Sequence, residues 1–216
     1  GGGVPFDLLD GFVENAVGGF PLPLGIAANF TIDGRDLLVP MAVEESSVVA
    51  AASNMARLVR NTGGFRTKVL EDLMIGQIQV LDLRDVGAAA RQVQDRQAEI
   101  VALANACDPM LVSRGGGCVG LECRILGRDV TGGAPVLVVH LLVHTVDAMG
   151  ANVVNTMAEA LSGRIEAWTG GRAGLRILSN LADRRRFAAT CRVRVHDLDV
   201  GEIDGADVAD LIAEAS

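Results

Sequence analysis

A turn that could hold a phosphate group lies at residues 146–152, which read Val-Asp-Ala-Met-Gly-Ala-Asn. It follows an apolar run and precedes a segment in which apolar residues recur at the spacing of a helix. Free backbone N–H groups and the positive end of the helix dipole favour an anion at such a place. Gly150 would let the backbone approach a ligand closely. A strand, a glycine turn and a helix also occur as a plain connection, so this pattern alone leaves both interpretations open.

Two acidic positions could take part in catalysis or ligand binding. Glu44 and Glu45 lie between an apolar run and an alanine-rich segment, where a carboxyl group could serve as a general acid. Asp108 precedes the run Gly115–Gly117 and could accept hydrogen bonds from a ribose diol. Solvated acids at a helix start, and an acid in a helix-ending turn, are the simpler interpretations. The residues alone leave these alternatives open.

Histidine and cysteine are the residues that could bind a metal. His140 and His144 are four positions apart on an expected strand and would share one face. Zinc needs further ligands nearby, so structural histidines are favoured. Cys118 and Cys123 should point to opposite faces of a strand, because an odd number of positions separates them. We expect the cysteines to be reduced core residues, and we predict no metal site.

The composition argues against two classes of function. The formal charge is −8, and Arg184–Arg186 is the one basic cluster, so we expect no binding to nucleic acid. No apolar stretch reaches the roughly 18 to 20 residues that a membrane helix needs, so we expect no membrane insertion. No secretory signal opens the sequence, and we therefore expect a cytoplasmic protein. Hydrophobic residues make up 50% of the chain, which is enough for a sizeable core.

The first part of the chain combines helices with a hairpin. Residues 7–17 are expected to form a short helix. Residues 24–43 predict two strands joined by a turn at Asp33-Gly34, a pair that strongly favours a hairpin. A helix over 48–60 should follow, capped by Ser46 or Ser47.

The middle part alternates between strand and helix patterns. The expected elements are a strand at 75–83, a helix that Asp85 caps and that ends near Cys107, strands at 119–126 and 135–146 joined through 131–133, a helix at 152–168, and a strand at 175–181. This β-α-β-β-α-β order predicts a ferredoxin-like split βαβ unit, with an antiparallel sheet and both helices on one side.

A strand at 188–196 and a helix at 206–215 should complete the chain. We therefore predict an α+β fold in which a ferredoxin-like domain over 72–180 is inserted into a second, incomplete domain. The two pieces of that second domain would be 1–71 and 181–216.

Five segments, in order, resemble motifs of one enzyme family. They are an ENxxG motif at Glu14–Gly18, a hairpin segment at Asn29–Pro40, an acidic motif at Val43–Ser47, a dinucleotide motif at Asp147–Asn152, and a substrate-site segment at Ile177–Asp183. The family is 3-hydroxy-3-methylglutaryl-CoA (HMG-CoA) reductase, and the short class II form in particular. The resemblance runs through nearly the whole chain.

The resemblance implies roles for residues of this sequence. Glu45 would be the acid that manages the proton on the aldehyde-level intermediate. The residues that would contact the substrate are Ser47, Asn180, Glu14 and Asn15. Those that would contact the cofactor are Asp147, Met149, Gly150 and Asn152 along the dinucleotide, and Asp108 at the adenine-side ribose.

The resemblance also implies a reaction and its participants. Two hydride transfers would take the thioester to a hemithioacetal and, after CoA leaves, mevaldehyde to mevalonate, or the reverse. NAD is expected rather than NADP, because Asp108 would accept from a free 2′-hydroxyl and repel a 2′-phosphate, although Arg114 is close in sequence. Family members build their sites from two subunits, so a homodimer is expected.

The sequence departs from the family in three respects. Ser46 stands where the acidic motif usually has proline, and the family's N-terminal helical segment has no counterpart. The family's catalytic Lys, Asp and His belong to a region beyond the one matched here, so residues 1–216 are expected to be inactive alone. The alternative hypothesis is a non-catalytic nucleotide-binding or interaction fragment.

Overall fold

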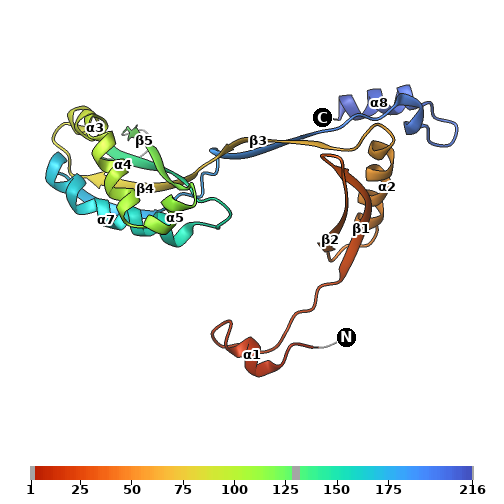
Figure 1. Cartoon of the computed structure of the whole chain (residues 1–216), viewed down its shortest axis with the longest axis horizontal. Coiled ribbons are helices and arrows are strands. Elements are labelled where there is room, and N and C mark those ends of the chain that lie inside the picture. Colours follow the sequence, from red (N-terminus) through yellow and green to blue (C-terminus); the bar gives the residue numbers. More distant parts are fainter. Residues whose placement is uncertain (1–2, 128–131, 216) are drawn as a thin grey trace. The chain divides into compact units, whose positions relative to one another are not determined.

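A computed structural model describes residues 3–127 and 132–215 of the chain (Figure 1). The fold is α+β, as expected. The chain divides into two compact units: residues 1–68 with 188–216, and residues 69–187.

The unit of residues 69–187 contains a four-stranded antiparallel sheet. Its strands are β4 (Met74–Leu81), β5 (Gly117–Leu126), β6 (Val136–His144) and β7 (Arg172–Leu178), in the order β5-β6-β4-β7. The predicted antiparallel sheet is therefore confirmed. The segment 131–133, expected to join β5 to β6, lies partly outside the described residues. The last strand begins three residues earlier than predicted, because Arg172 and Ala173 already pair with Leu81 and Val80.

The helices of this unit are α3 (Val86–Asp95), α4 (Gln97–Ala106), the short α5 (Pro109–Ser113) and α7 (Ala151–Thr169). Asp85 caps α3 as predicted, since its carboxylate accepts from the N–H of Ala88 at 2.8 Å. The single helix expected up to Cys107 is interrupted at Arg96, which leaves the helical conformation. The Arg96 guanidinium lies 5.5 Å from the centre of the Trp168 ring on α7.

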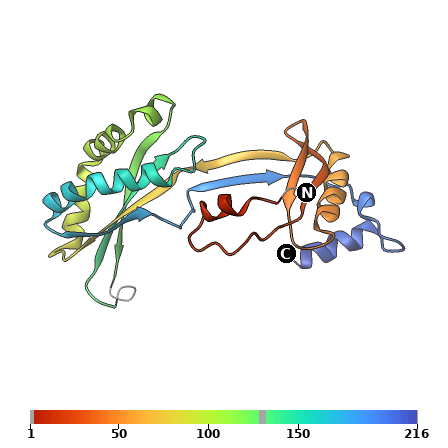
Figure 2. The ribbon, with the colours of Figure 1, turned by 90° about the horizontal axis from the view of Figure 1, so that it is seen from below.

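One face of the sheet and the long helices enclose the core. Alternate strand residues are fully buried there, among them Ile78, Val80, Leu137, Val139, Leu141 and Val143. They meet buried residues of α3, α4 and α7, such as Val93, Ile100, Val154, Met157, Leu161 and Ile165. Figure 2 shows α7, in cyan, lying along these strands. The period-2 and helical apolar patterns thus face each other across one hydrophobic layer.

A β-bulge in β5 corrects the expected orientation of two cysteines. Cys118 pairs with Val143 and Gly120 pairs with Leu142, so Val119 is an extra residue in the ladder. The extra residue shifts the alternation by one position, and Cys118 and Cys123 both pack toward the helices. The prediction that they point to opposite faces was therefore wrong. Burial raises the pKa of the Cys118 thiol and raises that of Cys123 to about 11.

The first unit begins with α1 (Phe6–Asp10), which is much shorter than the helix predicted over 7–17. Strands β1 (Leu24–Ile32) and β2 (Arg35–Ala42) form the predicted hairpin. Both turn residues have positive φ, 49° at Asp33 and 78° at Gly34, as a type I′ turn requires. Helix α2 (Val48–Arg60) has its predicted bounds and packs on β1. Ser47, one of the two predicted caps, is its N-cap residue, but it has a φ of 68° and its side chain makes no capping bond.

The remaining elements were less well predicted. Strand β3 (Arg66–Asp72), which was not predicted, pairs with β8 (Arg185–Thr190) in a two-stranded sheet. Strand β8 begins and ends earlier than the expected strand at 188–196, and a 3-10 turn follows at Val195–Leu198. Helix α8 (Gly205–Glu214) lies within one residue of its prediction. Among the described helices, none is long and apolar enough to cross a membrane.

Candidate cofactor site

A pocket of about 480 Å³ opens in the unit of residues 69–187. Two segments that are distant in sequence form its walls. One wall comes from α5 and its two ends, and the other from the turn that leads from β6 into α7. The lining residues are Asp108, Met110, Leu111 and Arg114 from the first wall and residues 145–153 from the second.

The turn before α7 is held in a conformation that suits close approach of a ligand. The Thr145 hydroxyl donates to the carbonyl of Ala148 at 3.0 Å, and Thr145 is only 2% exposed. Gly150 precedes the helix with a φ of 88°, and a Cβ there would lie 2.4 Å from the Thr145 methyl group. Any other residue here would require the buried Thr145 side chain or the turn itself to move, and would have to adopt the positive φ that glycine tolerates best. Val146 also has a positive φ, 54°, which is strained for a β-branched residue.

The N-terminus of α7 opens onto the same pocket. The helix has 19 residues, and its first N–H groups have no partner within the helix. These groups and the helix dipole favour negative charge. The predicted phosphate-binding turn and the start of a long helix thus form one wall.

The opposite wall is organised by Asp108. One oxygen of its carboxylate accepts from the N–H of Leu111 at 2.9 Å and thereby caps α5. Its second oxygen can accept a further hydrogen bond. Arg114 follows α5 at the other end, and it forms no ion pair with any described residue. The pocket therefore offers one guanidinium, two carboxylates (Asp108 and Asp147) and a helix N-terminus.

Close backbone packing fixes the position of this wall. A Cβ on Gly116 would lie 2.6 Å from the Leu111 side chain and 2.7 Å from the carbonyl oxygen of His144. The Asn105 side chain adds a two-point bridge to Cys118, with distances of 3.0 Å and 2.7 Å. The run Gly115–Gly117, whose role the sequence left open, brings the chain close to the end of β6.

The structure gathers the predicted cofactor residues into one place. Asp108, Asp147, Met149, Gly150 and Asn152 all line the pocket. The role of each in binding stays a prediction. Sequence reasoning missed the contribution of Thr145, although a small polar residue before a turn could have drawn attention to it.

The predicted substrate residues are exposed on loops. Glu45 and Ser47 lie two positions apart between β2 and α2. Glu14 and Asn15 follow α1, and Asn15 has a φ of 56°. Asn180 follows β7 and belongs to the other unit. The structure thus brings Glu45 and Ser47 together within one loop.

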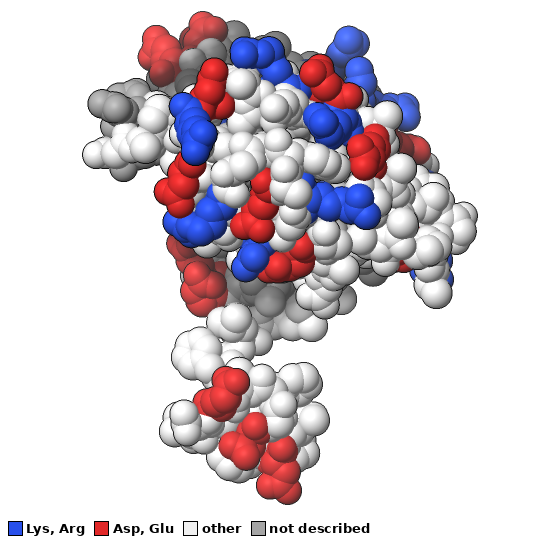
Figure 3. Space-filling view, turned by 90° about the vertical axis from the view of Figure 1, so that its left-hand side faces the viewer, with Lys and Arg blue, Asp and Glu red and all other residues white. Residues whose placement is uncertain are grey.

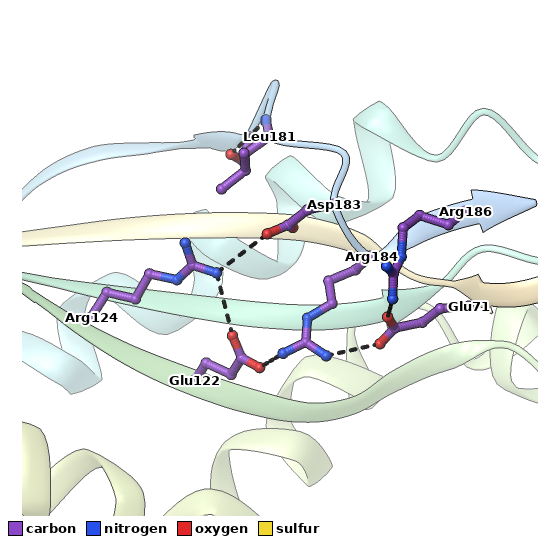
Figure 4. Close-up of polar contacts among 8 residues, drawn as sticks. Glu71, Glu122, Arg124, Leu181, Asp183, Arg184 and Arg186 are labelled. Atoms are coloured by element: carbon purple, nitrogen blue, oxygen red, sulfur yellow. Dashed lines mark hydrogen bonds and ion pairs between the residues drawn. The ribbon is translucent and has the colours of Figure 1, made fainter. Parts of the chain in front are cut away.

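The basic cluster is neutralised by neighbouring acids (Figure 4). Arg184 pairs with Glu71 at 3.0 Å and also with Glu122, while Arg186 pairs with Glu71 at 3.6 Å. Arg124 extends the network by bridging Glu122 and Asp183. In the upper part of Figure 3, basic and acidic side chains are interspersed. This cluster does not form a basic patch of the kind that binds nucleic acid.

The two histidines of β6 have different surroundings. His140 is 5% exposed, and its Nδ1 atom has no hydrogen-bond partner in the part of the chain that the structure describes. Burial lowers the pKa of His140, with a further contribution from Arg124 and an opposing one from Asp183. His144 lies at the end of the strand, beside the pocket. Within the described ranges, no three His, Cys, Asp or Glu residues are grouped to hold a metal ion.

Comparisons with known proteins agree on one family. The family model described as hydroxymethylglutaryl-coenzyme A reductase matches residues 2–216. The chain is 52% identical over 208 residues to the 3-hydroxy-3-methylglutaryl-coenzyme A reductase of Archaeoglobus fulgidus, covering 96% of this chain and 46% of that protein. A probable reductase of Borreliella burgdorferi is 32% identical over 189 residues, covering 86% of this chain and 41% of that one.

Solved structures show the same likeness. The reductase of Streptococcus pneumoniae superposes with a TM-score of 0.90 at 36% identity, over 97% of this chain and 49% of that one. A class II reductase structure from the same organism, described as bound to NADPH in open conformations, also has a TM-score of 0.90, at 35% identity over 97% of this chain and 50% of that one. The chain spans about half the length of the relatives that it matches.

Proposed function

The chain belongs to the hydroxymethylglutaryl-coenzyme A reductase family, and we propose that it supplies the cofactor pocket and the active-site acid of such an enzyme. The substrates would be HMG-CoA, or mevalonate and CoA in the reverse direction. The unit carrying the pocket would be the cofactor domain, over about 72–180, inserted between two pieces of a substrate-binding domain at 1–71 and 181–216.

The pocket fits a nicotinamide dinucleotide. A Cβ at Gly150 would clash with the Thr145 side chain, so glycine suits the turn that places the start of α7 at the pocket, where the first helical N–H groups could bind a phosphate. Asp108 retains an oxygen that can accept from a ribose hydroxyl, because its other oxygen caps α5. The nicotinamide group, when bound, supplies or accepts hydride. The protein's part is to hold the cofactor and to manage protons.

NAD is the cofactor that we propose, with NADP less favoured. The carboxylate of Asp108 would repel a 2′-phosphate and accept from a 2′-hydroxyl. Arg114 lines the same pocket and carries the charge that could favour the phosphate. Asp108 and Arg114, at the two ends of α5, would therefore have opposite effects on the preference for NAD over NADP.

Glu45 is proposed as the acid that moves protons at the substrate. In the first step, hydride adds to the thioester carbon and a proton reaches its oxygen, which gives a hemithioacetal. The carbon–sulfur bond then breaks, and CoA leaves as its thiol with a proton while the carbonyl of mevaldehyde forms. A second hydride and proton complete mevalonate. Glu45 lies exposed on the loop after β2, where a substrate can reach its carboxyl group.

Further residues are proposed to contact the substrate. Ser47 and Asn180 are proposed to contact the hydroxymethylglutaryl group, with Glu14 and Asn15 contributing from the first motif. The family's Lys, Asp and His would come from outside residues 1–216. Turnover is therefore expected of the full-length enzyme, and residues 1–216 alone are expected to be inactive.

The observation that carries this proposal is the close packing of Gly150 against Thr145 at the start of α7. Substitution of Gly150 is therefore the test. Gly150→Ala should abolish NAD binding, because the new methyl group meets Thr145 at 2.4 Å and φ is positive. Gly163→Ala is the matched control, since it lies within the same helix and a Cβ there meets nothing within 4 Å. Calorimetric titration of the full-length protein with NAD⁺ measures both. Equal affinity in the two variants would contradict the proposed site.

A further inference from the structure

Thr145 is buried beside the turn that leads into α7, and it binds that turn with both its backbone and its side chain. Its carbonyl oxygen accepts from the N–H of Ala148 at 3.1 Å, and its hydroxyl donates to the carbonyl oxygen of Ala148 at 3.0 Å. Thr145 is only 2% exposed, so water competes little for either bond. Two hydrogen bonds between the same two residues therefore fix the peptide groups on both sides of Ala148.

The hydroxyl bond sets the orientation of the peptide group between Ala148 and Met149. In a trans peptide, the carbonyl oxygen and the N–H point in opposite directions. Because the Ala148 carbonyl points to the Thr145 hydroxyl, the N–H of Met149 points away from Thr145. Met149 is 72% exposed and lines the pocket. The hydroxyl thus determines which end of this peptide dipole a ligand can meet.

The Met149 N–H begins a run of backbone donors that continues into α7. In the part of the chain that the structure describes, the N–H groups of residues 149–153 have no hydrogen-bond partner. The last three belong to the first turn of the helix, where no carbonyl of the helix can reach them. All five residues line the pocket. Consecutive N–H groups of this kind can form a concave site for a phosphate.

The turn is strained, so its conformation has to be held by its neighbours. Val146 has a φ of 54° and Gly150 a φ of 88°. Without the hydroxyl bond, the peptide group between Ala148 and Met149 could rotate as a unit. Such a rotation would exchange the positions of its carbonyl oxygen and its N–H. The negative end of the peptide dipole would then face a bound phosphate and repel it.

We propose that Thr145 is a positioning residue for the cofactor, and that its hydroxyl keeps the Met149 N–H directed toward the diphosphate of the dinucleotide. The inference rests on the proposed function. The two branches of the side chain have separate roles, because the hydroxyl orients the peptide group and the methyl group packs against Gly150. Loss of the hydroxyl should weaken the binding of ligands that carry the diphosphate and should leave the chemical steps unchanged.

Thr145→Val tests the hydroxyl, because valine keeps the shape of the side chain and lacks the donor. Calorimetric titration of the full-length protein with NAD⁺ should give a Kd about tenfold above the native value, the size of effect expected for one lost hydrogen bond. ADP-ribose, which carries the diphosphate and lacks the nicotinamide, should lose affinity by the same factor. The KM for the cofactor should rise with the Kd, while kcat changes little.

Two further variants serve as controls. Thr156→Val removes the same kind of bond one to two turns into α7, where the Thr156 hydroxyl donates to the carbonyl of Asn152 at 2.9 Å. Thr156 lies outside the lining of the pocket, so the Kd should keep its native value. Thr145→Ser retains the hydroxyl and loses only the methyl group, so it should bind NAD⁺ nearly as tightly as the native protein. Urea unfolding of the two valine variants compares their stability independently of binding.

The outcomes distinguish this role from the proposed function. A native protein that binds no nicotinamide cofactor would overturn both. Native affinity in Thr145→Val would overturn the role of Thr145 and leave the proposed function standing. If Thr145→Val does not fold, the serine variant decides, since a tenfold loss of affinity in Thr145→Ser would show that the hydroxyl is not the group that matters. A loss of kcat at unchanged KM would also contradict a positioning role.

Discussion

Asp108 is the residue that we expect to decide between NAD and NADP. Replacement by asparagine removes the negative charge and keeps an oxygen that can cap α5, so the fold of the wall is preserved. The ratio of kcat/KM for NADH to that for NADPH should fall about tenfold in the full-length enzyme, which corresponds to about 1.4 kcal/mol. Asp95→Asn, at the end of α3, is the control for a charge change outside the pocket. A native preference for NADPH would refute the assignment.

Glu45, rather than Glu44, should be the acid at the substrate. Glu45→Gln keeps the size of the side chain but cannot donate or accept the proton. We expect kcat to fall by at least about a hundredfold, with NAD⁺ affinity nearly unchanged. Glu44→Gln is the neighbouring control and should retain most activity. Steady-state rates of the two full-length variants show which glutamate is the acid. Near-normal turnover in Glu45→Gln would mean that Glu45 does not transfer the proton.

The secondary-structure elements show what local sequence can and cannot specify. The hairpin at Asp33-Gly34 and helix α2 were predicted because the turn chemistry and the apolar spacing are contained within each segment. The bulge at Val119 was not, because an extra ladder residue is defined by the partner strand. Strand β3 escaped notice since its sequence, Arg-Thr-Lys-Val-Leu-Glu-Asp, lacks a buried face.

The candidate site, too, was predictable where it depends on local sequence and unpredictable where it depends on contacts between distant segments. The turn at 146–152 and Asp108, which the structure places in one pocket, could both be singled out from the sequence. Their convergence in one pocket depends on the pairing of β5 with β6, which places Gly116 against His144. Contacts of this kind join segments about thirty positions apart, and no local pattern encodes them.

Helix α3 allows a direct test of its cap. Asp85→Ala removes the acceptor of the Ala88 N–H and should lower the free energy of unfolding by about 1 kcal/mol. Asp85→Asn retains an acceptor, so it should lower the free energy of unfolding by only a few tenths of a kcal/mol. Urea unfolding followed by circular dichroism compares the two. Equal stability of Asp85→Ala and the native protein would show that the cap contributes nothing.

For the molecule as a whole, we expect a homodimer. Apolar side chains stand exposed on the hairpin of the first unit, with Leu24 at 72%, Ile26 at 61% and Leu38 at 67% exposure. Such a surface favours burial against another surface. Multi-angle light scattering of the full-length protein at micromolar concentration should give twice the mass of one chain, and a monomer alone at that concentration would contradict the expectation.

The pairing of β3 with β8 has a consequence for how such a protein could arise. The chain enters the unit of residues 69–187 along one of these strands and leaves along the other, and the Leu73 N–H donates to the carbonyl of Arg184 at 2.9 Å. Neighbouring strands lie about 5 Å apart, so the two ends of the unit can be joined by a very short linker. A gene segment encoding it could therefore be gained or lost in one recombination event, with little entropic cost to the host chain.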